Sequence, residues 1–215
     1  MGMSSARVTG LLLAAGAGRR FGGPKALVQD GRGPWLHRAA RALLDGGCQD
    51  VLVVTGAAAE EVEELVLALG DPRVGSIRCG TWQAGMGESL RAGLTILATR
   101  GRTVPSQALV HLVDLLDVDA EVVARVLGAA PTAITPDAVL ARAAYQGVPG
   151  HPVLLGQQHW QAVLDGARGD TGARSYLRTT RPLLVECGDL ATGVDVDVAP
   201  AHAPDVPRGR GTPPG

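Results

Sequence analysis

A loop of small and basic residues follows the first apolar run of the chain. Positions 14–18 read A-A-G-A-G, and Arg19, Arg20 and Lys25 follow within a few residues. Glycines let successive backbone N–H groups converge on an anion, and the basic side chains supply full charges for outer phosphate oxygens. The alternative is an ordinary strand–turn–helix junction with surface arginines. We favour a site for the phosphates of a nucleoside triphosphate, with contacts from Leu13, Ala14, Ala15, Gly16, Ala17, Gly18, Arg19 and Lys25.

Two common phosphate loops do not fit this segment. A Walker loop places Ser or Thr after its Gly-Lys pair, whereas here the glycine pair is followed by P-K-A. A dinucleotide fingerprint needs a third glycine where Phe21 stands, and an acid after the second predicted strand, which ends in V-T-G. The sequence therefore indicates neither a P-loop ATPase nor a standard dehydrogenase.

Three acidic residues are candidates for a metal site. Asp114 directly follows an apolar run, and Asp195 and Asp197 lie two positions apart near the end of the chain. An acid at the carboxyl end of a buried strand is well placed to hold Mg²⁺ against a triphosphate. If residues 195–197 form a strand, both carboxylates point to one side, and spacing does not choose between them. The alternatives are a turn or cap role for Asp114 and a solvated acidic strand for the pair.

A helix start offers a second candidate contact for the nucleotide. Gly87 and Ser89 open an apolar, helix-like segment that runs to about Thr99. Backbone N–H groups and a hydroxyl at this position can bind an anion or a base edge. The alternative is a capped helix that only packs on the sheet.

Strand-like and helix-like segments alternate along the chain and must position these residues. Buried strands are predicted at Val8–Leu13, Asp50–Thr55, Val74–Cys79 and Ala108–Val113, and helices at Pro34–Leu44, Glu60–Leu69, Gly87–Thr99 and from the cap Asp119 to Leu127. The second half is predicted to hold strands at Ala138–Tyr145, Val153–Leu155 and Leu183–Cys187, a loop at Gln146–Pro152, and helices at Gln157–Leu164 and Gly172–Arg178. This alternation predicts an α/β protein, a three-layer α/β/α Rossmann-like fold with a mainly parallel sheet. Such sheets bind ligands beyond the carboxyl ends of their strands.

Size and composition favour a single cytoplasmic domain. The 215 residues fit one domain over 1–198, and the Pro- and Gly-rich stretch 199–215 is predicted to be a disordered tail. The net charge of −1 argues against a nucleic-acid partner. Three cysteines without a C-x-x-C pair argue against a disulfide framework or a zinc site. The first apolar run is too short to span a membrane.

The loop as a whole resembles the signature of the MobA-like NTP transferase family, nucleotidyltransferases related to molybdenum cofactor biosynthesis. Its pattern reads L-A-A-G-x-G-x-R-M-G-x-P-K, and Phe21 stands at the Met position. Other segments resemble the family in the same order: G-M-G-E-S-L at 85–90, L-V-D at 112–114, P-G-H-P-V-L at 149–154, G-D-T-G-A-R at 169–174 and D-V-D at 195–197.

This resemblance implies a reaction and roles for individual residues. A nucleoside monophosphate would pass to a phosphate-bearing acceptor, molybdopterin in this family, with release of pyrophosphate. Ala15 is typical of the cytidylyl branch, which favours CTP over GTP. Arg19, Lys25 and Asp114 would be catalytic, Asp114 would share Mg²⁺ with Asp195 or Asp197, and His151, Asp170 and Arg174 would contact the acceptor. A molybdenum hydroxylase would be the partner that receives the product.

Two departures from the family pattern keep other functions open. Leu116 occupies the usual proline position after Asp114, and V-A-P at 198–200 replaces T-P-E. One alternative is transfer to a sugar phosphate or an alcohol phosphate. The other is a non-catalytic molybdenum cofactor carrier or insertion chaperone on the same scaffold.

Overall fold

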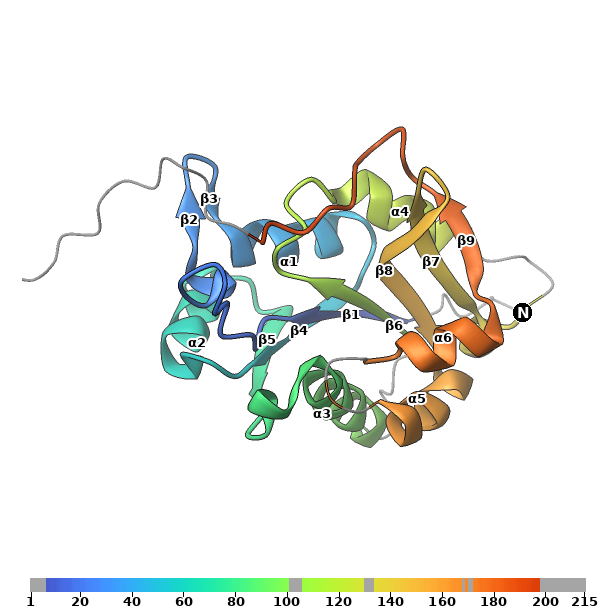
Figure 1. The fold of residues 1–215 in the computed structure, drawn as a ribbon, viewed down its shortest axis with the longest axis horizontal. Helices are drawn as coiled ribbons and strands as arrows, with labels where there is room; N and C mark the ends of the chain where they lie inside the picture. Colours follow the sequence, from blue (N-terminus) through green and yellow to red (C-terminus); the bar gives the residue numbers. More distant parts are fainter. Residues whose placement is uncertain (1–6, 101–105, 130–133, 168, 170–171, 198–215) are drawn as a thin grey trace, which may run out of the picture.

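The core of the molecule is a seven-stranded sheet with strand order β5-β4-β1-β6-β8-β7-β9 (Figure 1). The computed structural model describes residues 7–100, 106–129, 134–167, 169 and 172–197. Its strands are β1 (Val8–Leu13), β4 (Asp50–Thr55), β5 (Val74–Arg78), β6 (Gln107–Leu112), β7 (Leu140–Tyr145), β8 (Val148–Gly156) and β9 (Leu183–Glu186). A separate small hairpin pairs β2 (Gln29–Asp30) with β3 (Gly33–Pro34). The predicted tail, 199–215, lies outside the described residues.

The sheet is mainly parallel, as predicted. Strand β1 is central, pairing in parallel with β4 and β6, and β4 pairs in parallel with β5. All six residues of β1 are buried, because helices cover both faces of this part of the sheet. The α/β fold class is confirmed, and the carboxyl ends of β1, β4 and β6 meet at one edge of the sheet.

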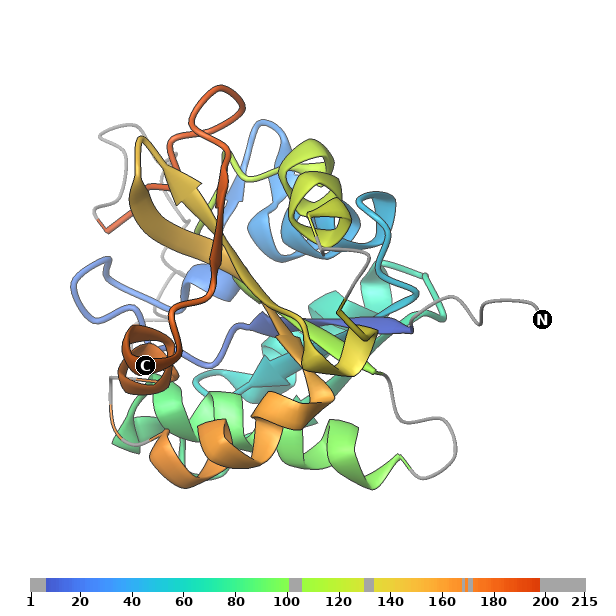
Figure 2. The ribbon, with the colours of Figure 1, turned by 90° about the vertical axis from the view of Figure 1, so that its right-hand side faces the viewer.

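Six helices form the two outer layers. On one face lie α1 (Trp35–Asp45), α2 (Ala59–Ala68) and α4 (Ala120–Gly128); on the other lie α3 (Met86–Thr99), α5 (Trp160–Gly166) and α6 (Arg174–Thr180). Figure 2 shows α3 and α5 side by side beneath the sheet. Successive residues of a strand point to opposite faces, so Leu12 packs with α1 while Leu11 and Leu13 pack with α3. Asp119 accepts a hydrogen bond from the Glu121 N–H at the start of α4, which confirms its predicted role as a cap.

The second half of the sheet corrects one prediction. Residues 146–152 were predicted to form a loop, but only Gln146 and Gly147 turn the chain, with φ of 53° and 78°. Strand β8 then begins at Val148 and runs antiparallel to both β7 and β6. A register shift between Arg142 and Ala144 lets the hairpin accommodate a strand that contains proline and glycine. Positive φ at two successive turn residues is typical of a tight β-hairpin.

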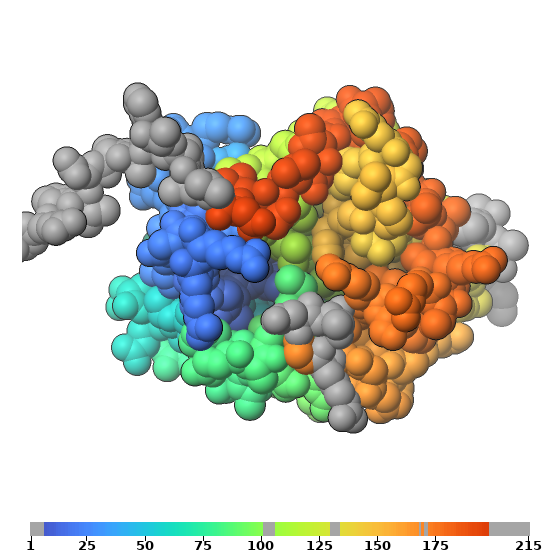
Figure 3. Space-filling model, viewed as in Figure 1, coloured from blue at the N-terminus to red at the C-terminus, as the bar shows by residue number. Residues whose placement is uncertain are grey.

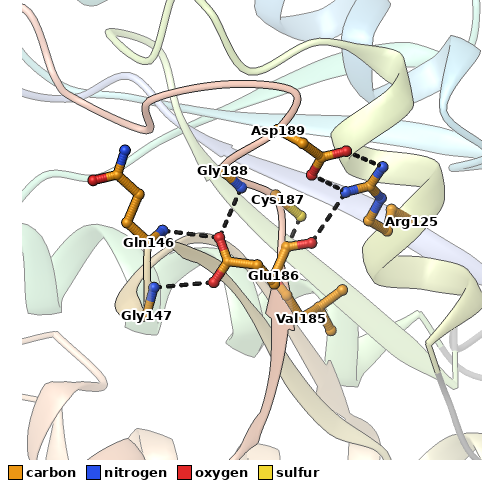
Figure 4. Close-up of polar contacts among 8 residues, drawn as sticks. All are labelled: Arg125, Gln146, Gly147, Val185, Glu186, Cys187, Gly188 and Asp189. Carbon is orange, nitrogen blue, oxygen red and sulfur yellow. Dashed lines mark hydrogen bonds and ion pairs between the residues drawn. The ribbon is translucent and has the colours of Figure 1, made fainter.

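The carboxylate of Glu186, at the end of β9, connects this strand to the β7–β8 turn, as Figure 4 shows. Glu186 accepts hydrogen bonds from the backbone N–H groups of Gln146, Gly147 and Gly188, at 2.8, 3.0 and 2.8 Å. These bonds, from Gly147 first, lower the pKa of the Glu186 carboxyl. Beside it, Arg125 of α4 forms an ion pair with Asp189 and donates to the Glu186 carbonyl. The hairpin turn, β9 and α4 are thereby joined just before the chain turns toward the candidate site.

In the described part of the chain, no helix is long and apolar enough to cross a membrane. Cys48, Cys79 and Cys187 are all buried as free thiols. Burial raises the pKa of the Cys48 thiol to about 12.

Candidate active site

The loop after β1 folds back on a single carbonyl. Gly18 has φ of +56°, and its carbonyl accepts hydrogen bonds from the N–H groups of Phe21, Gly22 and Gly23, at 2.9, 2.9 and 3.2 Å. A Cβ at Gly18 would lie 1.9 Å from the carbonyl oxygen of Gly23, so no larger residue fits. Gly16 is exposed with open space around it. The loop is therefore fixed at Gly18 and open to a ligand at Gly16.

The ends of this loop are attached to neighbouring elements. The Ala57 N–H donates to the Ala15 carbonyl at 3.0 Å, which holds the loop against the end of β4. At the far end, Phe21 packs edge-on against Trp35 of α1, with ring centroids 5.5 Å apart. The backbone donors of the loop are thus preorganised before any ligand binds.

Lys25 lies between acids that come from distant parts of the chain. Its Nζ is 2.7 Å from Asp114 Oδ2 and 3.1 Å from Asp197 Oδ1. Burial opposes the charge on Lys25, but hydrogen bonds and attraction from Asp114 and then Asp197 outweigh it, and its pKa is raised. The hydrogen bond and charge of Lys25 lower the pKa of Asp197 in turn, with a smaller contribution from Arg20. The structure therefore brings three of the predicted site residues together.

The two late acids reach the site on an irregular segment, 189–197, rather than on a strand. The strand considered for residues 195–197 does not form, because these residues have no ladder partner within the described part of the chain. It is held instead by Thr192, whose N–H and hydroxyl both donate to Asp117 Oδ2, and by the Val196 N–H, which donates to the Asp114 carbonyl at 3.3 Å. Asp197 meets Lys25, and Asp195 lines the cavities described next.

A cavity of about 430 Å³ opens over the loop. Its wall includes the whole segment 13–19 together with Lys25, Ser89, Asp114 and Asp195. Figure 3 shows this face of the molecule hollowed between the N-terminal loop (blue), segment 189–197 (red) and α6 (orange). Ser89, in the first turn of α3, is buried and lines the cavity. Gly87 is also buried but does not line it. This first cavity collects the residues predicted to bind a nucleotide, with the exception of Gly87.

A second cavity, of about 560 Å³, adjoins the first. The two share wall residues Leu13, Met86, Leu112 and Asp195. His151 and Arg174, predicted for the acceptor, line the second cavity, and Asp170 lies outside the described residues. Burial, followed by repulsion from Arg142 and Arg174, lowers the pKa of His151 to about 4, so its ring is neutral at pH 7. Two ligands that occupied these cavities would meet near Asp195.

Comparison with known proteins decides the family. The model of the MobA-like NTP transferase domain matches residues 10–184. The chain belongs to the MobA-like NTP transferase family. A curated relative, nicotine blue oxidoreductase from Paenarthrobacter nicotinovorans, is 36% identical over 203 residues, which cover 88% of this chain and 92% of the relative.

Solved structures agree with this family at the level of the fold. A nucleotidyl transferase from Methanothermobacter thermautotroptrophicus superposes with a TM-score of 0.70 at 21% identity, over 89% of this chain and 92% of that chain. Rv0371c of Mycobacterium tuberculosis H37Rv, crystallised as a complex with manganese, gives a TM-score of 0.64 at 22% identity, over 88% and 94% of the two chains.

The donor groups of this family member suit a hard divalent cation. Asp114 and Asp197 present carboxylate oxygens to one point, which the Lys25 ammonium now occupies. Within the described ranges, no three acidic, histidine or cysteine side chains cluster as a closed metal site. Mg²⁺ commonly binds through one or two carboxylates and completes its shell with substrate phosphates and water. The residues present therefore fit a metal that arrives with a nucleotide.

Three further residues with polar or aromatic side chains line the two cavities and were not predicted from the sequence. Trp82 and Gln83 line the first cavity from the turn before α3, and Arg142 lines the second from β7. An aromatic residue just beyond a predicted strand was a usable signal for Trp82. Arg142 carried no such signal, because it lies inside a predicted strand, and only the side to which it points makes it part of the cavity.

Proposed function

We propose that this protein transfers a nucleoside monophosphate from CTP to the terminal phosphate of a molybdopterin-type acceptor, releasing pyrophosphate. The observation that carries the proposal is the meeting of Lys25, Asp114 and Asp197 beside a preorganised anion loop. The second cavity, with His151 and Arg174 in its wall, gives the acceptor a place next to the nucleotide. We place the reaction in the cytoplasm, with a molybdenum hydroxylase as the recipient of the product, and Asp170 on the acceptor side.

The chain's own residues would act by positioning and neutralising charge. An oxygen of the acceptor phosphate forms a bond to the α-phosphorus, the bond from that phosphorus to the bridging oxygen breaks, and pyrophosphate leaves with those electrons. The backbone of 14–18, Arg19 and Lys25 hold the triphosphate and its leaving group. Asp114 and Asp197 would hold Mg²⁺, which neutralises phosphate charge when bound. His151 is neutral and orients the acceptor, because an ionised phosphate nucleophile needs no base.

The preference for CTP rests on Ala15 at the start of the loop. Its side chain is buried, and a Cβ on the adjoining Gly56 would lie 2.7 Å from it. The same Cβ would lie 2.7 Å from Trp82, so Ala15 and Trp82, which both line the cavity, pack closely against Gly56. The preference for CTP otherwise follows the resemblance of A-A-G at 14–16 to the cytidylyl branch.

The curated relative supports a second candidate function. It is named nicotine blue oxidoreductase, so the same cleft could instead carry out a redox reaction on a compound such as nicotine blue, with a nicotinamide dinucleotide as the redox partner. The phosphates of that dinucleotide would use the same anion loop. The absence of a G-x-G-x-x-G fingerprint favours the transferase.

One set of assays on the purified chain separates these candidates. Pyrophosphate release is measured with CTP, GTP, UTP or ATP, with Mg²⁺, and with molybdopterin or a sugar 1-phosphate as acceptor. NADH and NADPH oxidation is followed in parallel with nicotine blue as the electron acceptor. Release that requires CTP and molybdopterin supports the proposal. Release only with a sugar 1-phosphate, or dinucleotide oxidation without any release, contradicts it.

A further inference from the structure

Two arginines face the second cavity without an acidic partner. Arg142 lies on β7 and Arg174 begins α6, and both line the cavity wall. Within the described ranges neither arginine forms an ion pair, although Asp195 lines the same cavity. A guanidinium keeps its charge in any protein environment, so the two positive charges persist together.

The environment of Arg142 makes this arrangement costly. Its Nε and Nη2 donate to the Gly150 carbonyl, at 3.1 and 2.9 Å, and the guanidinium is half-buried. Burial first, and repulsion by Arg174 second, lower the pKa of Arg142. His151 beside them is neutral and contributes no compensating charge. A partly buried cation beside a like charge is unfavourable unless an anion joins it.

The other residues in the wall of the second cavity indicate what kind of molecule would carry that anion. Most of its wall is aliphatic: Leu13, Leu90, Val110, Leu112, Val153 and Leu155 come from the sheet and α3. Such a wall offers no hydrogen bonds to a chain of hydroxyl groups, whereas it contacts a flat or apolar body well. The polar side chains in the wall are those of Arg142, His151, Arg174 and Asp195.

We infer that Arg142 is a specificity residue that, together with Arg174, binds the phosphate of an acceptor whose remaining body is a flat ring system rather than a chain of hydroxyl groups. This inference rests on the proposed function, and it adds a residue and a substrate class to it. The triphosphate of the donor nucleotide could also bring a phosphate group to these arginines. The position of both arginines in the second cavity, away from the loop 14–18, favours the acceptor.

A purely structural role for Arg142 is the competing explanation. Its hydrogen bonds to Gly150 join β7 to the start of β8 and would stabilise the hairpin without any ligand. A structural role predicts lost stability on substitution and no specific loss of anion binding. The test therefore needs a ligand-sensitive signal inside the cavity.

The ring of His151 provides that signal. Inorganic phosphate, and separately pyrophosphate, is titrated into histidine-labelled full-length protein at pH 7, and the ring resonance of His151 is followed. We expect phosphate to shift it saturably. Arg142→Met should weaken phosphate binding by about tenfold or more, because a charge-assisted pair is lost. Arg178→Met, on the exposed side of α6, is the matched control and should change binding by less than about twofold.

Several outcomes overturn the inference. It fails if the resonance of His151 does not move, if Arg142→Met titrates as wild type does, or if pyrophosphate alone gives an Arg142-dependent shift. Should Arg142→Met not fold, Arg174→Met serves in its place, because Arg174 is exposed and makes no hydrogen bond to Gly150. Binding of Mg²⁺–CTP, measured in parallel, should be unchanged in both variants. If the wild type does not bind CTP, the proposed function is refuted, whereas the inference that the two arginines bind phosphate is still supported by the phosphate titration.

Discussion

At the scale of single residues, the anion loop depends on one glycine. Gly18 combines a positive φ with a carbonyl that three N–H groups share, and its missing side chain leaves space for the Gly23 carbonyl. The neighbouring Gly23 has open space around it and no such constraint. The two glycines of one loop therefore differ in what they can tolerate.

We predict that Gly18→Ala abolishes nucleotide binding while Gly23→Ala leaves it nearly intact. Alanine at Gly18 must either adopt an unfavourable φ or move the loop, at a cost on the order of 1–3 kcal/mol, and either change misaligns the backbone donors. Calorimetric titration with Mg²⁺–CTP checks this. Equal affinities for the two variants would show that the loop does not hold the phosphates.

The sequence predicted much of the site, and the limits of that prediction have a physical cause. Lys25 and Asp114 were named because loop and strand end are local signals. The choice between Asp195 and Asp197 could not be made, because it depends on how segment 189–197 is held. In the structure Asp197 meets Lys25, while Asp195 lines both cavities. Metal binding by any of these acids stays a prediction.

At the scale of elements, segment 189–197 depends on Asp117. Both donors of Thr192 converge on one Asp117 oxygen, and Val196 bonds to the carbonyl of Asp114. Gly193 lies so close to the Tyr145 ring that a Cβ would be 2.1 Å from it. The loop after β6 thus holds the segment that carries the late acids.

We predict that Asp117→Ala weakens Mg²⁺–nucleotide binding by about tenfold, because freeing Thr192 lets Asp197 leave the site. Asp119→Ala is the matched control: it removes the cap of α4 and should cost about 1 kcal/mol of stability without changing nucleotide affinity. Urea unfolding and calorimetry on both variants separate the effects. If both variants bind nucleotide as the wild type does, Asp117 does not position the acids.

The elements themselves were predicted unevenly. Strands β1 and β4 were predicted with the bounds they have, because a strand covered on both faces is a continuous apolar run. The first part of β8, residues 148–152, was predicted to be a loop because Pro149, Gly150 and Pro152 are typical of loops. Val148 and Pro149 pair with Tyr145 and Ala144 of β7, and this pairing overrides the local preference.

At the scale of the whole molecule, the sheet places two cavities side by side at its carboxyl edge. The two cavities share the wall residues Leu13, Met86, Leu112 and Asp195, and the proposed reaction would take place beside them. The acceptor side is built largely by the antiparallel extension, β7 and β8, and by α6. In the proposed function, the parallel half of the sheet therefore supplies the nucleotide site, and its antiparallel extension supplies the acceptor site.

A buried histidine makes the whole fold sensitive to acid. His111 on β6 is fully buried, its ring nitrogens have no partner among the described residues, and burial lowers its pKa to about 3. The unfolded chain binds this proton below about pH 6.5, whereas the folded chain does so only near its lowered pKa, so stability falls as pH falls between these values. We predict a loss of roughly 2 kcal/mol between pH 7 and pH 5 from this residue.

Urea unfolding of His111→Leu against wild type tests that prediction. Leucine suits the buried position, so the variant should be less sensitive to pH than the wild type. An unchanged pH dependence would show that His111 does not govern the loss.

In the proposed function, the N-terminal loop together with Asp114 and Asp197 holds a nucleoside triphosphate and a divalent metal. Calorimetric titration of wild type and Asp114→Asn with CTP and GTP, each with and without Mg²⁺, tests it most directly. We predict Mg²⁺-dependent binding of CTP, binding of GTP at least about tenfold weaker, and a similar loss of CTP affinity in Asp114→Asn. Binding of neither nucleotide, or equal CTP binding by both proteins, would contradict the account.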